Sequence, residues 1–424
     1  MKKLNINDQF KLSLKAVAKE LDKEPSEVSL TQYSSSDISN RLSEWELRKL
    51  GGFNNLKNLH FPVEREVERE TLSRIVKGQR SKLEAKYGKE ILIKEDFLST
   101  FKQIMKDNPI VLHKPIKESK AKKNLQRSVV VHFSDTHYGC NIAKNEMNGL
   151  NEYNWTIAAR RTAFVIDQAV KYKPQHRDNT ELVVCLNGDI LAGVIHDQEF
   201  GVDLMTTQFA GALSILSQGI SYVAGHYSKV RVVCTTGNHD RMMHKSSKDR
   251  AMNHKWDSYA TMLYLALREA LTAKHTNIEF DIPESPYAIL NIQGHKFFQS
   301  HGDSVLNVGN PGKSINMSSI NQQINKLNTQ VLKGPENFAG VIVGHVHTAT
   351  VQLTDSETTL LVNGCLSGTD SFAQAVGIFN NHPSQTIFEV TEDHAVGDIR
   401  LVKVLGADNM YEFDKIIKPF TGKF

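Results

Sequence analysis

Cysteine is scarce in this sequence, long apolar runs are missing, and the excess of charge is small. The four cysteines are far apart and form no C-x-x-C pair: Cys140, Cys185, Cys234 and Cys365. This spacing excludes a disulfide framework and a structural zinc finger of the C-x-x-C type. No stretch approaches the roughly 18–20 apolar residues of a membrane span, and the first residues, "MKKLNINDQFKLSLK", lack the apolar core of a secretory signal. We expect a cytoplasmic protein with no membrane partner.

The net charge of +4 over 424 residues is too small to indicate nucleic-acid binding by itself. Basic residues are nevertheless concentrated in "HKPIKESKAKKNLQR" (113–127), where six lysines and arginines accompany one acid, Glu118. Because this segment has no apolar periodicity, it is predicted to be a basic linker at a domain boundary. It is either a solvated tether or an arm that contacts the phosphates of DNA.

Residues 1–112 have the pattern of short helices. Leu14, Val17 and Leu21 recur at helical spacing, and the pair Gly51-Gly52 is typical of a helix end. We expect an additional N-terminal all-α domain over residues 1–112. This domain is either a helix-turn-helix-like module that binds DNA or a module that assembles a homo-oligomer.

From residue 128 onward, continuous apolar runs predict buried β-strands. The runs are "SVVVHF" (128–133), "ELVVCL" (181–186), "VRVVCT" (230–235) and "GVIVG" (340–344). The segments between the first three runs have helical periodicity, and after His347 strand patterns dominate. Residues 128–424 are therefore predicted to form an α/β domain with a substantially parallel sheet and a second sheet or antiparallel edge.

Polar residues follow the apolar runs where the strands should end. They are Asp135, His137, Asp189, Asn238, His301, His345 and His347. In open α/β sheets, ligands bind beyond the carboxyl ends of strands. Carboxylate, imidazole and amide groups suit two divalent ions that share a bridging carboxylate; manganese is expected, with magnesium, iron or zinc as alternatives. Alternation along an extended backbone would place Asp135 and His137 on one side.

The ordered motifs D-x-H, G-D, G-N-H-D, H-G and G-H-x-H resemble those of the calcineurin-like metallophosphoesterase superfamily over roughly residues 128–365. The resemblance implies a four-layer α/β/β/α sandwich and a metal-dependent phosphoesterase. It implies a first metal held by Asp135, His137 and His347, and a second held by Asn238, His301 and His345. It further implies that Asp189 bridges the two ions.

The residues after Asn238 are candidates for catalysis and substrate binding. The resemblance implies that His239 acts on the leaving group while a metal-bridged hydroxide attacks phosphorus. Asp240 either orients His239 or closes the turn. Arg241, His196 and His244 are candidate substrate-binding residues, with Arg241 as a clamp for a phosphate oxygen. Tyr138 and Trp155 either stack on a base or pack in the core.

The motifs say less about which phosphoester is the substrate than about the family. "GDILAG" and "GNHDR" depart from the Ser/Thr protein phosphatases, which have V-D-R-G and G-N-H-E. "SDTHYG" and "GDI" are similar to SbcD-type DNA exonucleases, and "EYNWTIAARR" (152–161) resembles phage-encoded phosphoesterases.

Three functional hypotheses follow from these motifs. The leading one is a dinuclear metal-dependent phosphodiesterase that acts on DNA, as a nuclease or an end-processing enzyme. The alternative is an enzyme acting on small or cyclic nucleotides, with the N-terminal domain serving oligomerisation. A non-enzymatic binding subunit is a third hypothesis, and the intact ligand set argues against it.

Overall fold

The computed structural model describes residues 102–103, 105–106, 110–114, 127–172, 180–194, 201–242, 255–370, 373–374, 377 and 382–421. All of these belong to one compact unit, Phe97–Phe424. The N-terminal helices that the sequence predicts lie outside the described residues, as does most of the basic segment. Among the described helices, none combines the length and the apolar content needed to cross a bilayer.

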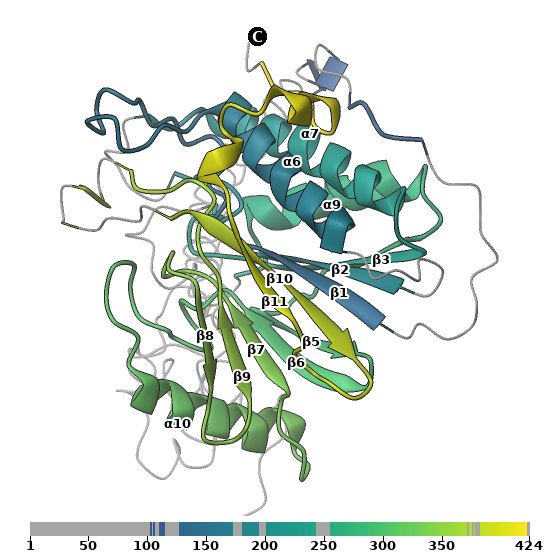
Figure 1. The fold of residues 1–424 in the computed structure, drawn as a ribbon, viewed down its shortest axis with the longest axis vertical. Helices are drawn as coiled ribbons and strands as arrows, with labels where there is room; N and C mark the ends of the chain where they lie inside the picture. The colour runs from purple at the N-terminus through teal and green to yellow at the C-terminus, as the bar shows by residue number, and fades with distance from the viewer. Residues whose placement is uncertain are drawn as a thin grey trace, which may run out of the picture. The chain divides into compact units, whose positions relative to one another are not determined.

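The first sheet has six strands in the order β11-β10-β1-β2-β3-β4 (Figure 1). Its strands are β1 (Arg127–Phe133), β2 (Thr180–Asn187), β3 (Lys229–Thr235), β4 (Ile278–Asp281), β10 (Ser384–Thr391) and β11 (Ile399–Lys403). Strands β1 to β4 pair in parallel, whereas β10 pairs antiparallel with both β1 and β11. The three valine-rich strands predicted first are β1, β2 and β3, and nearly all their residues are buried. The predicted parallel sheet and its antiparallel edge are confirmed.

The second sheet has five strands in the order β5-β6-β7-β9-β8. Its strands are β5 (Tyr287–Ile292), β6 (His295–Ser300), β7 (Gly340–Val343), β8 (Thr350–Leu353) and β9 (Thr359–Val362). Strands β6, β7 and β9 are parallel, and β5 and β8 are antiparallel edges. The apolar run at residues 340–344 therefore belongs to the second sheet, although its composition matches that of β1 to β3.

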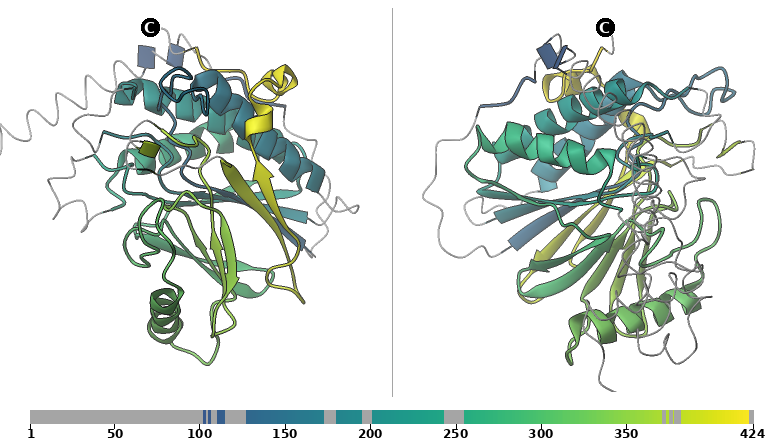
Figure 2. Two further views of the ribbon diagram at one scale, coloured as in Figure 1. Left: turned by 60° about the vertical axis from the view of Figure 1, so that its left-hand side comes forward. Right: turned by 180° about the vertical axis from the view of Figure 1, so that it is seen from behind.

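Helices cover the outer face of each sheet, so the layers run helix, sheet, sheet, helix (Figure 2). The first sheet carries α6 (Trp155–Tyr172), α7 (Met205–Ala224) and α9 (Tyr259–Thr272). The second sheet carries α10 (Met317–Leu327), which continues into a π-helical turn, η4 (Asn328–Leu332). Short 3₁₀ turns, η5 (Leu405–Ala407) and η6 (Tyr411–Lys415), follow β11. The predicted α/β architecture with two sheets is confirmed.

The space between the sheets is apolar in its middle and polar near the strand ends. Val130, Val183 and Val233 of the first sheet meet Phe297 and Ile342 of the second, all fully buried. Burial of this apolar area is the main favourable contribution to packing the sheets together.

Toward the carboxyl ends of the strands, a hydrogen-bonded polar layer replaces the apolar contacts. Thr235 Oγ1 donates to Asn187 Oδ1 at 2.6 Å, and Asn187 Nδ2 lies 3.0 Å from His132 Nε2. Asn187 Nδ2 also donates to the carbonyl of Ile342 in the second sheet. Polar groups buried at this depth are tolerated because they are paired. The loops that follow the strands therefore begin from a rigid base.

Candidate metal centre

The loops after β1, β2, β6 and β7 meet at one edge of the two sheets and are joined by backbone hydrogen bonds. The N–H of Asp135 donates to the carbonyl of Gly188 at 3.1 Å, and the N–H of Gly344 donates to the carbonyl of His301 at 2.8 Å. The N–H of His345 donates to both carboxylate oxygens of Asp135 at 3.1 Å. Residues up to 210 positions apart in the chain are thereby held within contact distance.

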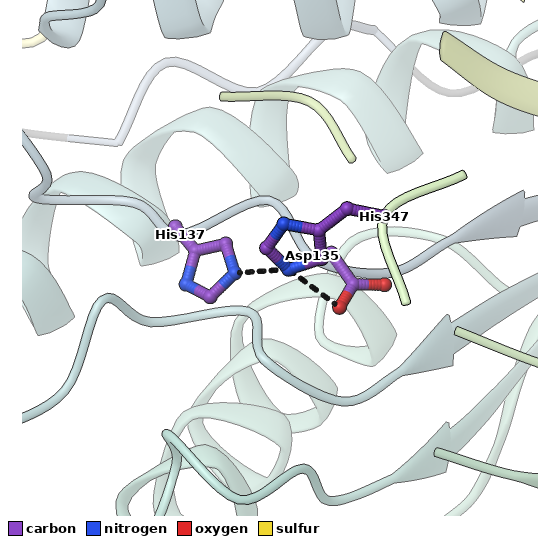
Figure 3. Close-up of side chains that lie close together, drawn as sticks. All are labelled: Asp135, His137 and His347. Atoms are coloured by element: carbon purple, nitrogen blue, oxygen red, sulfur yellow. Dashed lines mark hydrogen bonds and ion pairs between the residues drawn. The ribbon is translucent and has the colours of Figure 1, made fainter. Parts of the chain in front are cut away.

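A first cluster of three possible metal ligands comprises Asp135, His137 and His347 (Figure 3). The Nε2 atoms of His137 and His347 lie 3.2 Å apart, and His347 Nε2 lies 3.4 Å from Asp135 Oδ1. One ligand atom from each of the three residues lies within 4.8 Å of the others. Two ring nitrogens and a carboxylate oxygen that converge in this way can hold a divalent ion.

A second cluster comprises Asp189, His301 and His345. His301 Nδ1 lies 2.9 Å from the carbonyl of Asn187, to which only an N–H can donate, so Nε2 is the ring atom presented to the cluster. Asp189 Oδ1 accepts the backbone N–H of His239 at 2.7 Å, whereas Oδ2 lies 3.0 Å from His301 Nε2. Asp189 therefore directs one oxygen toward the protein and the other toward the cluster.

Two buried polar atoms of this region have no hydrogen-bond partner among the described residues, namely His301 Nε2 and Asn238 Oδ1. The contact of His301 Nε2 with Asp189 Oδ2 is an ion pair of 3.0 Å whose angle is poor for a hydrogen bond. Buried polar atoms without partners are rare in folded proteins. An ion between them would satisfy both, and the donor set therefore fits a divalent metal.

The electrostatics of the pocket separate its imidazoles into two kinds. Burial, together with the neighbouring rings of His239 and His347, lowers the pKa of His137 to about 3. Burial and His301 lower the pKa of His345 to about 4. These two rings are thus neutral, the form that binds metal. Burial opposes charge on His301 as well, but the carboxylates of Asp189 and Asp135 raise its pKa to about 9.

Five of these side chains are carried by backbone in the left-handed region. The φ angles are 51° at Asp135, 47° at His137, 49° at Asp189, 73° at His345 and 62° at His347. A non-glycine residue in this region costs of order 1–3 kcal/mol and persists only where its surroundings enforce it. Four other non-glycine residues among the described ones share this backbone, namely Asn148, Gln293, Lys333 and Glu357, but five of the nine such residues belong to the two clusters.

These angles correct the expectation that alternation along an extended backbone brings Asp135 and His137 together. Strand β1 ends at Phe133, before Asp135 and His137, and β7 ends at Val343, before His345 and His347. Neither pair of ligands therefore lies on a strand. Left-handed residues turn the chain back at each ligand instead. Asp135 and His137 meet because both backbones turn, not because they are two positions apart on a pleat.

Glycines leave room for the carboxylates. A Cβ on Gly237 would lie 2.0 Å from Asp189 Oδ1, and a Cβ on Gly344 would lie 2.4 Å from Asp135 Oδ2. Any side chain at either position would displace a carboxylate, because atoms cannot approach so closely without bonding. The glycines beside the predicted ligands are needed for close approach.

A protein-family comparison agrees with this geometry. The family model described as calcineurin-like phosphoesterase matches residues 128–349, just over half of the chain. The chain belongs to the calcineurin-like phosphoesterase family. The resemblance indicated by the five motifs is thereby confirmed, and this phosphoesterase is a hydrolase of phosphoester bonds from a family that uses two divalent ions.

Several solved structures match the chain at low identity. A 5'-nucleotidase from Candida albicans is 14% identical with a TM-score of 0.33, and the match covers 73% of this chain but 56% of that one. A dimetal phosphatase from Danio rerio is 11% identical with a TM-score of 0.33, and the match covers 65% of this chain and 98% of that one. The calcineurin-like phosphoesterase YfkN from Bacillus subtilis is also 11% identical, with a TM-score of 0.27 and coverage of 68% of this chain and 96% of that one. TM-scores this low are not evidence about substrate. A comparison with curated proteins returned no match.

His239 lies at the edge of the first cluster in the phosphoesterase. Its ring packs edge-to-face on that of His137, with ring centroids 4.7 Å apart. Its Nδ1 lies 2.8 Å from the carbonyl of Ala192 and can only donate there. The ring is thus oriented by a backbone carbonyl.

Unlike His239, which lies at the edge of the first cluster, Asp240 binds the backbone. Its fully buried carboxylate accepts four backbone N–H groups, from Asp189, Ile190, Leu191 and Gly237, at 2.7–3.2 Å. These hydrogen bonds support the second of its two predicted roles, closure of the turn. Asp240 joins the loop after β2 to the loop after β3, which carry Asp189 and Asn238.

The other predicted site residues divide into those that the structure describes and those that it does not. Arg241 Nε donates to the carbonyl of Asn238 at 2.6 Å, and a role as phosphate clamp remains a prediction. Tyr138 is fully buried and Trp155 nearly so, with polar atoms bonded to Thr162 and Asp203, so both pack in the core. His196 and His244 lie outside the described residues.

Sequence reasoning missed a buried ion pair beside the second cluster. Lys255 Nζ donates to Asp303 Oδ1, and both side chains are almost fully buried. Thr236 Oγ1 also donates to the backbone carbonyl of Lys255 at 3.0 Å, which ties this residue to the Asn238 loop. The acid next to the H-G motif was a signal for Asp303, but the sequence contains no comparable signal for Lys255.

Metal uptake should depend on pH through His301. In chelator-treated protein its pKa of about 9 means that the ring carries a proton at pH 7, which a metal ion must displace. Because this folded-state pKa is above the unfolded value of about 6.5, the proton stabilises the metal-free fold below pH 6.5, and this stabilisation is lost as pH rises through about 9. Calorimetric titration with Mn²⁺ in buffers of different ionisation heat should detect proton release at pH 7 that decreases as the pH rises through about 9. Heats independent of the buffer at pH 7 would contradict this prediction.

Replacing Asp240 with asparagine should destabilise the fold. The amide group would direct donors at two of the four backbone N–H groups, a loss of roughly 2–4 kcal/mol in the free energy of unfolding. Urea denaturation of the Asp240→Asn variant measures this loss directly. The matched control is Asp393→Asn at an exposed position, which should change stability by less than about 0.5 kcal/mol. Equal stability of the two variants would remove the turn-closing role.

Proposed function

We propose that this phosphoesterase is a dinuclear metal-dependent phosphodiesterase that hydrolyses DNA, as a nuclease or an end-processing enzyme. The observation that carries the hydrolytic part is the pair of adjacent ligand clusters, with His239 packed against one of them. In this proposal Asp135, His137 and His347 hold one ion, Asn238, His301 and His345 hold the other, and Asp189 bridges them. Two bound divalent ions, Mn²⁺ being expected, would neutralise the phosphate and supply an activated water.

His239 supplies the proton that the leaving group requires. With Nδ1–H directed at the carbonyl of Ala192, the protonated ring can release a proton only from Nε2. The same carbonyl hydrogen bond fixes the plane of the ring. A departing alkoxide is a strong base, so this proton transfer contributes most when the leaving group is poor.

The DNA part of the proposal rests on the basic segment 113–127. The structure describes both of its ends, and both lie on the catalytic unit. The N–H of His113 donates to Ser221 Oγ on α7 at 2.9 Å, and Arg127 is the first residue of β1. Five lysines lie between these two attachment points. A polyanion is the ligand that such a cluster of positive charge favours.

The attachment point at Arg127 also predicts the length of DNA whose binding the basic segment would assist. Arg127 is at the start of β1, whereas Asp135 follows its end, so the seven residues of the strand separate them by roughly 23 Å, at about 3.3 Å per residue. That length corresponds to roughly seven base pairs of duplex, at about 3.4 Å per step. The lysines would therefore assist binding of DNA longer than this and leave the chemistry unchanged.

Removal of the His239 ring should separate chemistry from metal binding. We expect His239→Ala to retain both ions and to lose turnover by roughly 10²–10⁴-fold on an alkyl phosphodiester, the usual range for a general acid. The loss should shrink on a nitrophenyl ester, whose leaving group needs no proton. His394→Ala, at an exposed position, is the control and should change neither rate. An equal loss on both esters would limit His239 to positioning the phosphate.

Neutralising the basic segment should weaken DNA binding only. The variant replaces with glutamine Lys114, Lys117, Lys120, Lys122 and Lys123. It should raise KM for a duplex of about 20 base pairs and flatten the salt dependence, which has a slope of about −0.9 per neutralised phosphate. Turnover of a nitrophenyl phosphodiester should stay unchanged.

The matched control removes the same charge from exposed positions elsewhere in the catalytic unit. It replaces with glutamine Lys274, Lys326, Lys333, Lys403 and Lys415. If both variants lose DNA affinity equally, the effect is one of net charge alone. If neither does, and nucleotides are cleaved better than DNA, the enzyme acts on small or cyclic nucleotides.

A further inference from the structure

The segment "EYNWTIAARR" (152–161) contacts the turn that carries two of the first-cluster residues. The hydroxyl of Tyr153 donates to the backbone carbonyl of Thr136 at 2.6 Å. Thr136 stands between Asp135 and His137, and both Thr136 and Tyr153 are almost fully buried. The hydroxyl therefore acts on the peptide that joins the two ligand-bearing positions.

That peptide is held at both of its polar ends. Its oxygen accepts from Tyr153, and its N–H, which belongs to His137, donates to the carbonyl of Asp189 at 3.0 Å. Thr136 Oγ1 adds a hydrogen bond to the carbonyl of Ile190 at 2.8 Å. A flip of this peptide would change φ at His137 from its strained value of 47°, tilt its Cα–Cβ bond and so move the imidazole relative to the other ligands.

Without the tyrosine hydroxyl, the strained form would lose the hydrogen bond that balances it. The carbonyl of Thr136 is buried, and a buried carbonyl without a partner is costly. A peptide flip would then relieve the left-handed backbone at His137. The hydroxyl thus favours the one conformation in which Asp135 and His137 both face His347.

The rest of the segment fixes Tyr153 itself. Its backbone forms an antiparallel bridge with Ile142, with N–O distances of 2.8 and 3.0 Å. The guanidinium of Arg161 lies 5.4 Å from the centre of the Tyr153 ring. Arg161, which is fully buried, also binds both carboxylate oxygens of Asp408 and the carbonyl of Glu152. Tyr153 is therefore a rigid part of the domain.

We propose that Tyr153 is a positioning residue that sets the metal affinity of the first cluster through the Thr136–His137 peptide. The proposal rests on the metal-binding role given above to Asp135, His137 and His347. Its effect should be larger at the first site, because both side chains of the turn belong to that cluster, whereas His301 of the second cluster is oriented separately by the carbonyl of Asn187. Loss of a group that orients a metal ligand typically weakens binding by about 10–100-fold.

The test measures binding of Mn²⁺ alone, one site at a time, in the full chain. His345→Ala removes a ligand of the second cluster, so the first cluster becomes the stronger site. His347→Ala removes a ligand of the first cluster, so the second becomes the stronger site. Tyr153→Phe is added to each background, and free Mn²⁺ is followed by its electron paramagnetic resonance. We expect Tyr153→Phe to raise the dissociation constant about 10–100-fold in the His345→Ala background and less than about twofold in the other.

The matched control is Tyr227→Phe, which removes an equally buried hydroxyl that donates to the carbonyl of Ala169 at 2.7 Å. This control should leave Mn²⁺ binding unchanged in both backgrounds. If Tyr153→Phe does not fold, Thr136→Val removes the hydrogen bond to Ile190 from the same turn and should show the same selectivity.

The outcomes distinguish this proposal from the metal centre on which it rests. If each single-ligand variant loses one ion but Tyr153→Phe weakens both sites equally, or neither, the positioning role is wrong and the metal centre stands. If His345→Ala and His347→Ala both retain two ions at full affinity, the ligand assignment fails and the positioning role fails with it.

Discussion

Two buried carboxylates, Asp135 and Asp189, must face a common group of imidazoles, and the rest of the structure depends on this constraint. Like charges so close together repel, and burial raises the pKa of a carboxyl group. Histidines outweigh both effects here: burial opposes ionisation of Asp189, but His301 and its neighbours hold the pKa of its carboxyl well below the usual value. The pocket is thus built for cations.

The fold meets this constraint with two sheets rather than one. The parallel strands of the first sheet deliver Asp135, Asp189 and Asn238 to one edge, and the second sheet delivers His301 and His345 to the same edge. The polar layer around Asn187 lies between the apolar core and these loops. The backbone of the same residue serves the site directly, because the carbonyl of Asn187 binds His301 Nδ1.

The residues with strained, left-handed backbone are also those that other loops hold by hydrogen bonds. Four of the five ligands with a left-handed backbone donate their N–H to another loop: Asp135 to Gly188, His137 to Asp189, Asp189 to Asp240, and His345 to Asp135. Asp240 and the Lys255–Asp303 pair hold the loops after β2, β3 and β6. The strained turns are therefore supported by hydrogen bonds and ion pairs from the domain interior, which set the positions of the ligands.

Local sequence signals predicted four of the strands, the helices between the first three of them, and the chemistry of the site. Valine-rich runs predicted β1, β2, β3 and β7, and the five motifs identified the family and every residue of the two clusters, because these signals are local. Only the tertiary structure decided which sheet β7 joins, that Asp135 and His137 meet through left-handed turns, and that Asp240 binds backbone rather than His239. It also revealed Tyr153 and Lys255. Each of these depends on hydrogen bonds or ion pairs between residues 17 to 210 positions apart, and pairing over that distance leaves no periodic trace in a sequence.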